Sequence, residues 1–194
     1  TRTIYNFTNM EFRKVPEFQN KRFLFVGRLS EQKGFFDFCN IIKQFCKLNT
    51  DWNFRVIGNG EYKNDFKKFI KTENLDSRIN WSLISTDIQT EMENSSCLLM
   101  TSNFEGLPMV LIEASICALP AISYDTPTGP SDIISNSKSG FIIPIHNQEF
   151  FIAQMKEFVS NFELQQKLSI GAKKESKKFC KKHILCEWKK VFEQ

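Results

Sequence analysis

Residues 97–114, CLLMTSNFEGLPMVLIEA, contain an apolar run, a polar loop and the start of a second apolar segment. The first run predicts a buried strand. Pro108 suits the first turn of a helix, where its missing N–H has no partner in any case, and we expect this helix to continue to Ala118. Two carboxylates therefore flank the helix start: Glu105 lies on the loop and Glu113 about one turn into the helix.

The backbone N–H groups at a helix start lack partners and attract anions. The pattern favours a ligand with an anionic centre and hydroxyls at both ends, such as a nucleotide-sugar. Its pyrophosphate would bind near the N–H groups of Val110 and Leu111, its ribose near one glutamate and its hexose near the other. Each glutamate also has a simpler interpretation: Glu113 would complement the helix dipole, and Glu105 would be an exposed loop acid.

Short apolar segments alternate with amphipathic helical patterns along the chain, which predicts a parallel sheet covered on both faces. We therefore expect an α/β fold with a doubly wound, Rossmann-like parallel sheet. The expected strands span residues 23–26, 54–57, 79–81, 97–101, 121–124 and 140–143. The expected helices span residues 34–48, 62–70, 87–94, 108–118, 131–134 (capped by Ser131), 148–160 and 164–183, with a final helical stretch after them.

Four loops that contain glycine, proline or charged residues follow strands of the expected sheet. Parallel sheets bind ligands at the carboxyl ends of their strands, so we expect these loops to converge on one edge. They span residues 27–33, 58–60, 102–108 and 125–131.

Several motifs in these loops resemble one known family. Glu-Gly-x-Pro leading into Glu-Ala and then Leu119-Pro120, with seven residues between the two glutamates, is similar to the donor-site signature of GT-B glycosyltransferases of family four, the glycosyl transferases group 1. FVGRLSEQKG at 25–34 resembles the family's Gly-Arg…Lys-Gly segment, and VIGNG at 56–60 its Gly-x-Gly turn. Residues 129–134 and 140–141 resemble later donor-domain loops. The resemblance implies the C-terminal, donor-binding half of a GT-B enzyme of the bacterial surface-polysaccharide type.

The resemblance also assigns roles to the matching residues. Arg28 and Lys33 would neutralise the pyrophosphate as the sugar leaves, and Glu105 would bind the sugar hydroxyls, so these three form the expected catalytic set. Glu113 would accept hydrogen bonds from both ribose hydroxyls. The expected substrate-binding residues are Gly27, Gly58, Asn59, Gly60, Ile84, Gly106, Leu107, Pro108, Met109, Val110, Leu111 and Glu113.

Other interpretations of these residues stay open. Arg28 and Lys33 can be solvated surface charges, and residues 58–60 can be a plain turn. Residues 81–84 read WSLI where family members often have glycine near the base, so base recognition stays open. Residues 128–131 on the fourth loop are expected to border the sugar.

The resemblance implies a retaining glycosyltransferase that moves a hexose or N-acetylhexosamine from a nucleotide diphosphate-sugar to a glycan or lipid-linked acceptor. Residues 127–130 resemble those of bacterial surface-glycan transferases, which favours a UDP-sugar. The sequence has no Asp-x-Asp motif, so we expect no metal or other cofactor. The alternatives are a phosphorylase-like GT-B enzyme and a non-catalytic nucleotide-binding module. A dinucleotide-binding dehydrogenase is disfavoured because the first loop lacks G-x-G-x-x-G.

We expect three segments. Residues 1–20 would be a linker between lobes, residues 21–183 the nucleotide-sugar-binding domain, and residues 184–194 a helix that packs toward the protein's own N-terminal lobe. A complete GT-B enzyme has such a lobe, which supplies the acceptor site and often a catalytic histidine. Neither His146 nor His183 lies in a matching motif, so the isolated domain is expected to bind donor but turn over poorly.

The formal net charge of +4 permits anionic ligands, but no basic-aromatic motif points to nucleic acid as a partner. The six cysteines form no C-x-x-C pair, and most fall on apolar faces, which indicates a reducing compartment. Cys180, His183 and Cys186 recur at intervals of three, but three such residues without paired cysteines are a weak metal signal.

No secretory signal or bilayer-spanning apolar run is recognisable, so we expect a cytoplasmic location, with peripheral attachment at the inner face of a membrane as an alternative. A stripe of lysines at helical spacing is usually a solvated face. It can also contact anionic lipid. The stripe consists of Lys173, Lys174, Lys177, Lys178, Lys181 and Lys182.

Overall fold

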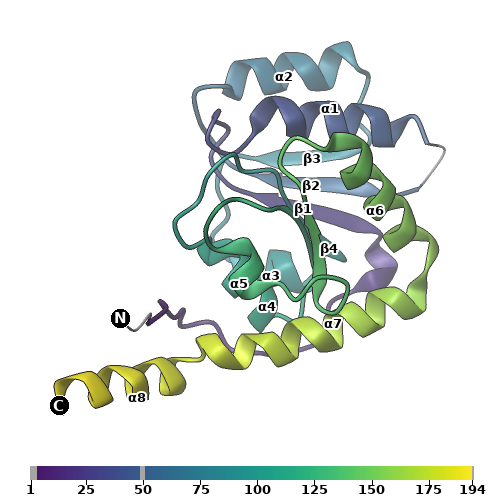
Figure 1. The fold of residues 1–194 in the computed structure, drawn as a ribbon. Helices are drawn as coiled ribbons and strands as arrows, with labels where there is room; N and C mark the ends of the chain where they lie inside the picture. The colour runs from purple at the N-terminus through teal and green to yellow at the C-terminus, as the bar shows by residue number, and fades with distance from the viewer. Residues whose placement is uncertain (1–3, 49–50, 194) are drawn as a thin grey trace.

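The computed structural model describes residues 4–48 and 51–193. Within them, six strands form one parallel sheet in the order β3-β2-β1-β4-β5-β6 (Figure 1), which confirms the expected doubly wound α/β fold. The strands are β1 (Arg22–Val26), β2 (Asn53–Ile57), β3 (Ile79–Ser82), β4 (Cys97–Met100), β5 (Ala121–Tyr124) and β6 (Gly140–Ile143). The α-helices are α1 (Phe35–Cys46), α2 (Lys63–Thr72), α3 (Ile88–Glu93), α4 (Met109–Ile116), α5 (Pro130–Ile133), α6 (Gln148–Ser160), α7 (Phe162–Ser176) and α8 (Lys181–Phe192), with 3-10 turns η1 (Phe18–Asn20) and η2 (Lys177–Phe179).

The strands are apolar throughout because both faces of the sheet are covered. Along β1, Phe23 and Phe25 enter one buried cluster, while Leu24 between them enters the other. Consecutive side chains of a strand point to opposite faces. A strand buried on both faces is therefore a continuous apolar run, which is the pattern that makes these strands recognisable in the sequence.

Helices cover each face. Figure 1 shows α1 and α2 on one side of the sheet and α3, α4 and α5 on the other, with α7 running alongside α4. The cluster on the α1 side is rich in aromatic rings: the ring centre of Phe23 lies 5.4 Å from that of Phe45, 4.8 Å from Trp52 and 5.6 Å from Phe54. The chain has 20 phenylalanines among its 194 residues, and much of this high content is core packing.

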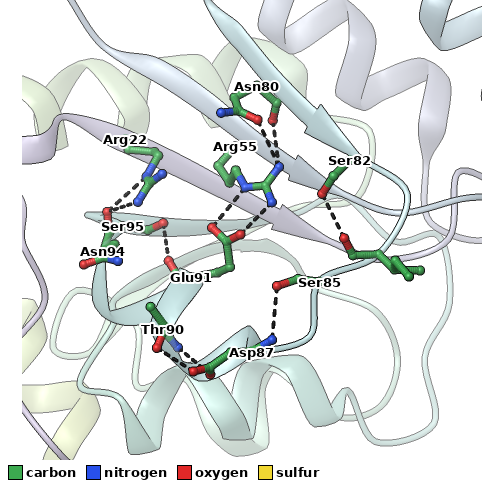
Figure 2. A network of polar contacts seen from close by, with 11 residues as sticks. Arg22, Arg55, Asn80, Ser82, Ser85, Asp87, Thr90, Glu91, Asn94 and Ser95 are labelled. Atoms are coloured by element: carbon green, nitrogen blue, oxygen red, sulfur yellow. Dashed lines mark hydrogen bonds and ion pairs between the residues drawn. The ribbon is translucent and has the colours of Figure 1, made fainter.

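A polar network fastens the sheet to α3. The guanidinium of Arg55 on β2 donates to both carboxylate oxygens of Glu91 on α3, at 3.0 and 2.5 Å, and to the side-chain oxygen of Asn80 on β3 at 3.1 Å (Figure 2). Arg22 on β1 donates twice to the carbonyl oxygen of Asn94, which follows α3. The Arg55 guanidinium lowers the pKa of the Glu91 carboxyl. The network thus links three strands to one short helix.

The strand order reverses at the centre of the sheet. β1 pairs with β2 on one side and with β4 on the other. Successive strands therefore move outward in opposite directions from the β1–β4 pair. In open α/β sheets, the carboxyl ends at such a switch point are where ligands bind.

The boundaries of α4 differ from the sequence prediction. Pro108 has φ −74° and ψ 93°, so it precedes the helix and does not lie in its first turn. The carbonyl of Pro108 accepts the first hydrogen bond of the helix, from Leu111 at 3.0 Å. The helix ends at Ile116, before the expected residue, and Ala118 has left-handed backbone with φ 55°.

The capping of α5 also differs. Gly129 occupies the cap position and Pro130 is the first helical residue, so Ser131 lies inside the helix and does not cap it. Proline suits this place because its fixed φ is already helical.

The C-terminal helical region is interrupted earlier than expected, so the prediction of one helix over residues 164–183 is wrong. α7 gives way to η2, Cys180 is extended with φ −70° and ψ 140°, and α8 begins directly after it. The interruption places Phe179 in the core, fully buried, with its ring centre 5.3 Å from that of Tyr5. The core contact of one phenylalanine thus accompanies the break in a lysine-rich helix.

The interruption also changes the lysine stripe, which is distributed over α7, η2 and α8 and not along one helix. Lys173 places Nζ 3.3 Å from the ring centre of Phe12, and Lys181 places Nζ 5.6 Å from that of Phe7. Lys178 pairs with a glutamate on α7. Three of the six lysines therefore contact the protein itself. α8 projects beyond the body of the domain (Figure 1).

Candidate active site

The loops after β1 and β4 meet at the carboxyl edge of the sheet. Nζ of Lys33 lies 2.5 Å from Oε1 of Glu105, and the two side chains are 21% and 8% exposed. The hydroxyl of Thr101 donates to the backbone carbonyl of Lys33 at 3.0 Å. The N–H of Asn103 donates to the carbonyl of Gln32 at 2.8 Å. Two residues singled out from separate motifs are therefore in direct contact.

Gly34 permits this close approach of the two loops. Its φ is +65°, and a Cβ at this position would lie 1.8 Å from the carbonyl oxygen of Thr101. A larger residue would push the two loops apart and separate Lys33 from Glu105. This is a physical reason for glycine after the lysine in the first motif.

The loop after β5 supports Glu105 from a third direction. The hydroxyl of Thr128 donates to the backbone carbonyl of Glu105 at 2.6 Å. Gly129, with φ +100°, packs so closely that a Cβ there would lie 2.4 Å from Cδ of Pro108. Three loops therefore hold Glu105 in place, and the loop expected to border the sugar contacts its backbone.

The start of α4 follows directly after this loop. Within the part of the chain that the structure describes, the N–H groups of Met109 and Val110 donate to no acceptor. The N–H of Leu111, which was expected to hold a phosphate, already donates to the carbonyl of Pro108. The side chains of Leu107, Met109 and Val110 are half-buried against the second core cluster. Two N–H groups are thus available to an anion.

Glu113 lies one turn into α4 and is partly buried. Burial raises the pKa of its carboxyl, and no other influence on this pKa is resolved. None of the described residues forms a hydrogen bond or ion pair with its carboxylate. Its oxygens are therefore available to the hydroxyl donors of a ligand.

The turn at residues 58–60 packs against the loop after β1. A Cβ at Gly58 would lie 1.9 Å from the carbonyl oxygen of Gly27, and one at Gly60 would lie 2.3 Å from that of Leu29. The carbonyl of Asn59 accepts the N–H of Leu29 at 2.9 Å. Packing alone therefore explains both glycines of this turn, and the expected role in ligand binding stays a prediction.

Other residues predicted to belong to the site have open space around them. A Cβ at Gly106 would meet nothing within 4 Å, and one at Gly27 would make only ordinary contacts from 3.5 Å. The side chain of Arg28 is exposed and has no partner among the described residues. Ile84 is 77% exposed, and its carbonyl accepts a hydrogen bond from the hydroxyl of Ser82 at 3.0 Å. These positions have room for a ligand.

Sequence reasoning missed a second polar cluster, which joins the first turn of α1 to the end of β5 and to the segment that leads from β6 into α6. Asp37, in the first turn of α1, accepts hydrogen bonds from the hydroxyl of Tyr124 at 2.9 Å and the amide of Gln148 at 2.6 Å. Its Oδ2 also lies 2.8 Å from Nδ1 of His146. Burial raises the pKa of Tyr124, which is fully buried. No motif links these residues, and they come from three separate places along the chain.

Two sizeable cavities lie elsewhere. One of 810 Å³ adjoins Arg22 and Asn94 at the amino ends of the strands, and one of 740 Å³ lies between residues 8–12 and the α7–α8 junction. Among residues 4–48 and 51–193, no three His, Cys, Asp or Glu side chains gather as a metal site, and Cys180 and Cys186 are exposed. None of the helices described has the length and apolarity to cross a bilayer.

The geometry defines a class of domain: a doubly wound α/β domain with a cationic loop, a carboxylate and free helix N–H groups at its switch point. The family model described as glycosyl transferases group 1 matches residues 8–175. The chain therefore belongs to the glycosyl transferases group 1 family, which confirms the resemblance in the loop motifs.

Curated relatives are named as glycosyltransferases. The chain is 34% identical over 173 residues to the amylovoran biosynthesis glycosyltransferase AmsD of Erwinia amylovora, covering 89% of this chain and 48% of that protein. It is 31% identical over 157 residues to the lipopolysaccharide 1,6-galactosyltransferase of Escherichia coli, covering 74% and 41% respectively. This chain thus spans about half of the length of these relatives, or less.

Solved structures share the fold. A mutant of S. aureus TarM in complex with fondaparinux, alpha-GlcNAc-glycerol and UDP matches with a TM-score of 0.84 at 24% identity, over 100% of this chain and 38% of that one. The C-terminal domain of the group 1 glycosyl transferase LpcC from Francisella tularensis matches with a TM-score of 0.72 at 18% identity, over 90% and 94%. The expected fold, the C-terminal half of a GT-B enzyme, is confirmed.

Proposed function

We propose that this chain is the donor-binding half of a retaining glycosyltransferase. It acts on a UDP-sugar and transfers a hexose or N-acetylhexosamine to a glycan or lipid-linked acceptor. The observation that carries the proposal is the convergence of Lys33, Glu105 and the start of α4 at one point of the sheet edge. Relatives named for amylovoran and lipopolysaccharide synthesis, and a structural neighbour in complex with UDP, support it.

Positive charge gathers where the diphosphate would leave. Arg28 and Lys33 lie on one loop, and two free N–H groups lie at the start of α4. These groups stabilise the negative charge that develops on the diphosphate as its bond to the sugar breaks. No metal or other cofactor is required in this scheme.

The two glutamates bind the two hydroxyl-bearing ends of the donor. Glu113 accepts hydrogen bonds from the ribose, and its partly buried carboxylate has no competing partner among the described residues. Glu105 accepts hydrogen bonds from the transferred sugar. A second lobe of the same protein supplies the acceptor site, and α8 packs toward that lobe.

Calorimetry with this chain and a panel of UDP, GDP, ADP and UDP-sugars tests the proposal. We expect UDP to bind more tightly than GDP or ADP, and one UDP-sugar to bind more tightly than UDP. A preference for GDP or ADP would contradict the base assignment. Binding of UDP without preference for any sugar favours a nucleotide-binding module. Phosphate-dependent release of a sugar phosphate by the full-length protein favours a phosphorylase-like enzyme.

A further inference from the structure

The ion pair between Lys33 and Glu105 joins two groups that need different ligand partners. Lys33 is the cation for the diphosphate, and Glu105 is the acceptor for the sugar hydroxyls. In the structure the two groups are paired with each other, with 2.5 Å between Nζ of Lys33 and Oε1 of Glu105. The carboxylate is only 8% exposed, so water replaces a lost cation poorly there. A donor therefore has to compete with this pair.

The loops themselves do not depend on the ion pair. The backbone of Lys33 is held by the hydroxyl of Thr101 at 3.0 Å, and the backbone of Glu105 by the hydroxyl of Thr128 at 2.6 Å. The lysine ammonium is a point charge on a flexible four-carbon stem. The pair can therefore open by rotation of the lysine side chain while both loops stay in place.

We propose, resting on the donor role above, that Lys33 and Glu105 exchange partners when donor binds, and that this exchange determines the preference for sugar-bearing donor over bare diphosphate. The diphosphate takes Lys33, which leaves the carboxylate of Glu105 without its cation. The hydroxyls of the donor sugar then replace the cation as hydrogen-bond donors to Glu105. Diphosphate and sugar thereby bind as one coupled unit.

The exchange also favours release of product. A bare diphosphate takes Lys33 but offers no hydroxyl to Glu105, so it leaves a largely buried carboxylate unpaired. After the sugar has been transferred, Glu105 competes for Lys33 and weakens the hold on the diphosphate. The pair thus selects donor over product at the same site.

Calorimetry with inorganic pyrophosphate, UDP and UDP-N-acetylglucosamine tests the exchange in this chain. We expect Glu105→Gln to bind pyrophosphate and UDP 3- to 10-fold more tightly than the wild type, and to lose most of the preference for the sugar-bearing ligand. In a Lys33→Ala background, Glu105→Gln should no longer tighten either anion. Thermal unfolding of each variant verifies that it is folded.

Glu31→Gln is the matched control, because it removes an equal charge from an exposed position on the same loop as Lys33. An equal gain in Glu31→Gln, or no gain in Glu105→Gln, would overturn the exchange. The exchange would also be overturned if the wild-type chain bound neither pyrophosphate nor UDP, because no anion would then compete with Glu105 for Lys33. Tightening for pyrophosphate without binding of UDP or UDP-N-acetylglucosamine would support the exchange and contradict the donor role.

Discussion

At the scale of single residues, Glu113 combines a cost to stability with a use in binding. Its partial burial raises the pKa of the carboxyl, so the folded chain holds this proton more tightly than the unfolded chain. The charged carboxylate therefore destabilises the folded state above the raised pKa. As the pH falls through that pKa, the group becomes neutral and the destabilisation disappears.

We therefore expect Glu113→Gln to raise the melting temperature of the ligand-free chain at pH 7 and to weaken UDP binding. Thermal unfolding at pH 7 and in acid measures the first effect, which should vanish once Glu113 is protonated in the wild type. Glu157→Gln, on an exposed position of α6, is the control and should change neither property. A lower melting temperature for Glu113→Gln at pH 7 would show that its carboxylate has a stabilising partner.

Arg28 is the opposite case, because its exposed side chain has no partner among the described residues. We expect Arg28→Ala to leave thermal stability unchanged and to weaken UDP binding by about 1.5–3 kcal/mol, the range for hydrogen bonds to charged groups. Calorimetry with UDP and with uridine separates the phosphate from the nucleoside. An equal loss for both ligands would place Arg28 at the base and not at the diphosphate.

The motifs identified individual site residues but not their contacts. Spacing along the chain placed Lys33 and Glu105 on loops that end at the same edge. Their ion pair depends on the left-handed backbone of Gly34, where a Cβ would lie 1.8 Å from the carbonyl oxygen of Thr101. No local pattern encodes this close approach of the two loops. The available donors at α4 likewise shifted to Met109 and Val110, because Pro108 lies before the helix.

At the scale of elements, the ion pair between Arg55 and Glu91 joins β2 to α3. The two side chains are 10% and 19% exposed, and Arg55 lowers the pKa of Glu91. A lowered carboxyl pKa contributes stability that is present above the unfolded-state pKa and is lost as the pH falls through the folded-state pKa.

We expect Glu91→Gln to cost about 3 kcal/mol of unfolding free energy at pH 7, because it leaves the Arg55 charge largely buried without its partner. Urea unfolding measures this cost, which should shrink in acid as the wild type loses the same carboxylate. The exposed pair of Lys71 and Asp76 provides the control: Asp76→Asn should cost less than about 1 kcal/mol. A cost for Glu91→Gln that does not change with pH would contradict the electrostatic explanation.

Strands were more predictable than helix ends for a physical reason. Burial on both faces makes each strand an apolar run, so local sequence is enough. The break between α7 and α8 falls in a lysine-rich segment without glycine or proline, where every residue is compatible with a helix. It accompanies the burial of Phe179 beside Tyr5, a contact between distant parts of the chain.

At the scale of the whole molecule, this chain spans about half the length of the curated relatives AmsD and the Haemophilus influenzae glycosyltransferase. Its candidate site consists of loops at one edge of the sheet, and several of their groups, including Arg28, Ile84 and Phe104, are exposed. α8 projects from the domain and exposes Leu185, Trp188, Val191 and Phe192 (Figure 1). A second lobe would cover the exposed groups of the site loops and the exposed apolar residues of α8. We therefore expect the contact surface with that lobe to include α8.

Trp188 is the most direct probe of that contact. It is 42% exposed, whereas Trp52 is buried and Trp81 is half-buried, so quenching by acrylamide in this chain reports mainly on α8. In the full-length protein we expect Trp188 to be protected from acrylamide. Buried aromatic residues carry much of the energy of protein contacts, so Trp188→Ser should destabilise the full-length protein by about 2 kcal/mol or more and leave this chain unchanged.

Ile170→Ser is the matched control, because Ile170 is 73% exposed on α7, outside α8. It should have little effect on the stability of either protein. Equal quenching of Trp188 in this chain and in the full-length protein would contradict the lobe contact. Protection of Trp188 only after addition of vesicles rich in anionic lipid would assign α8 and the neighbouring lysines to a membrane surface, since Trp and Lys together suit the lipid–water interface.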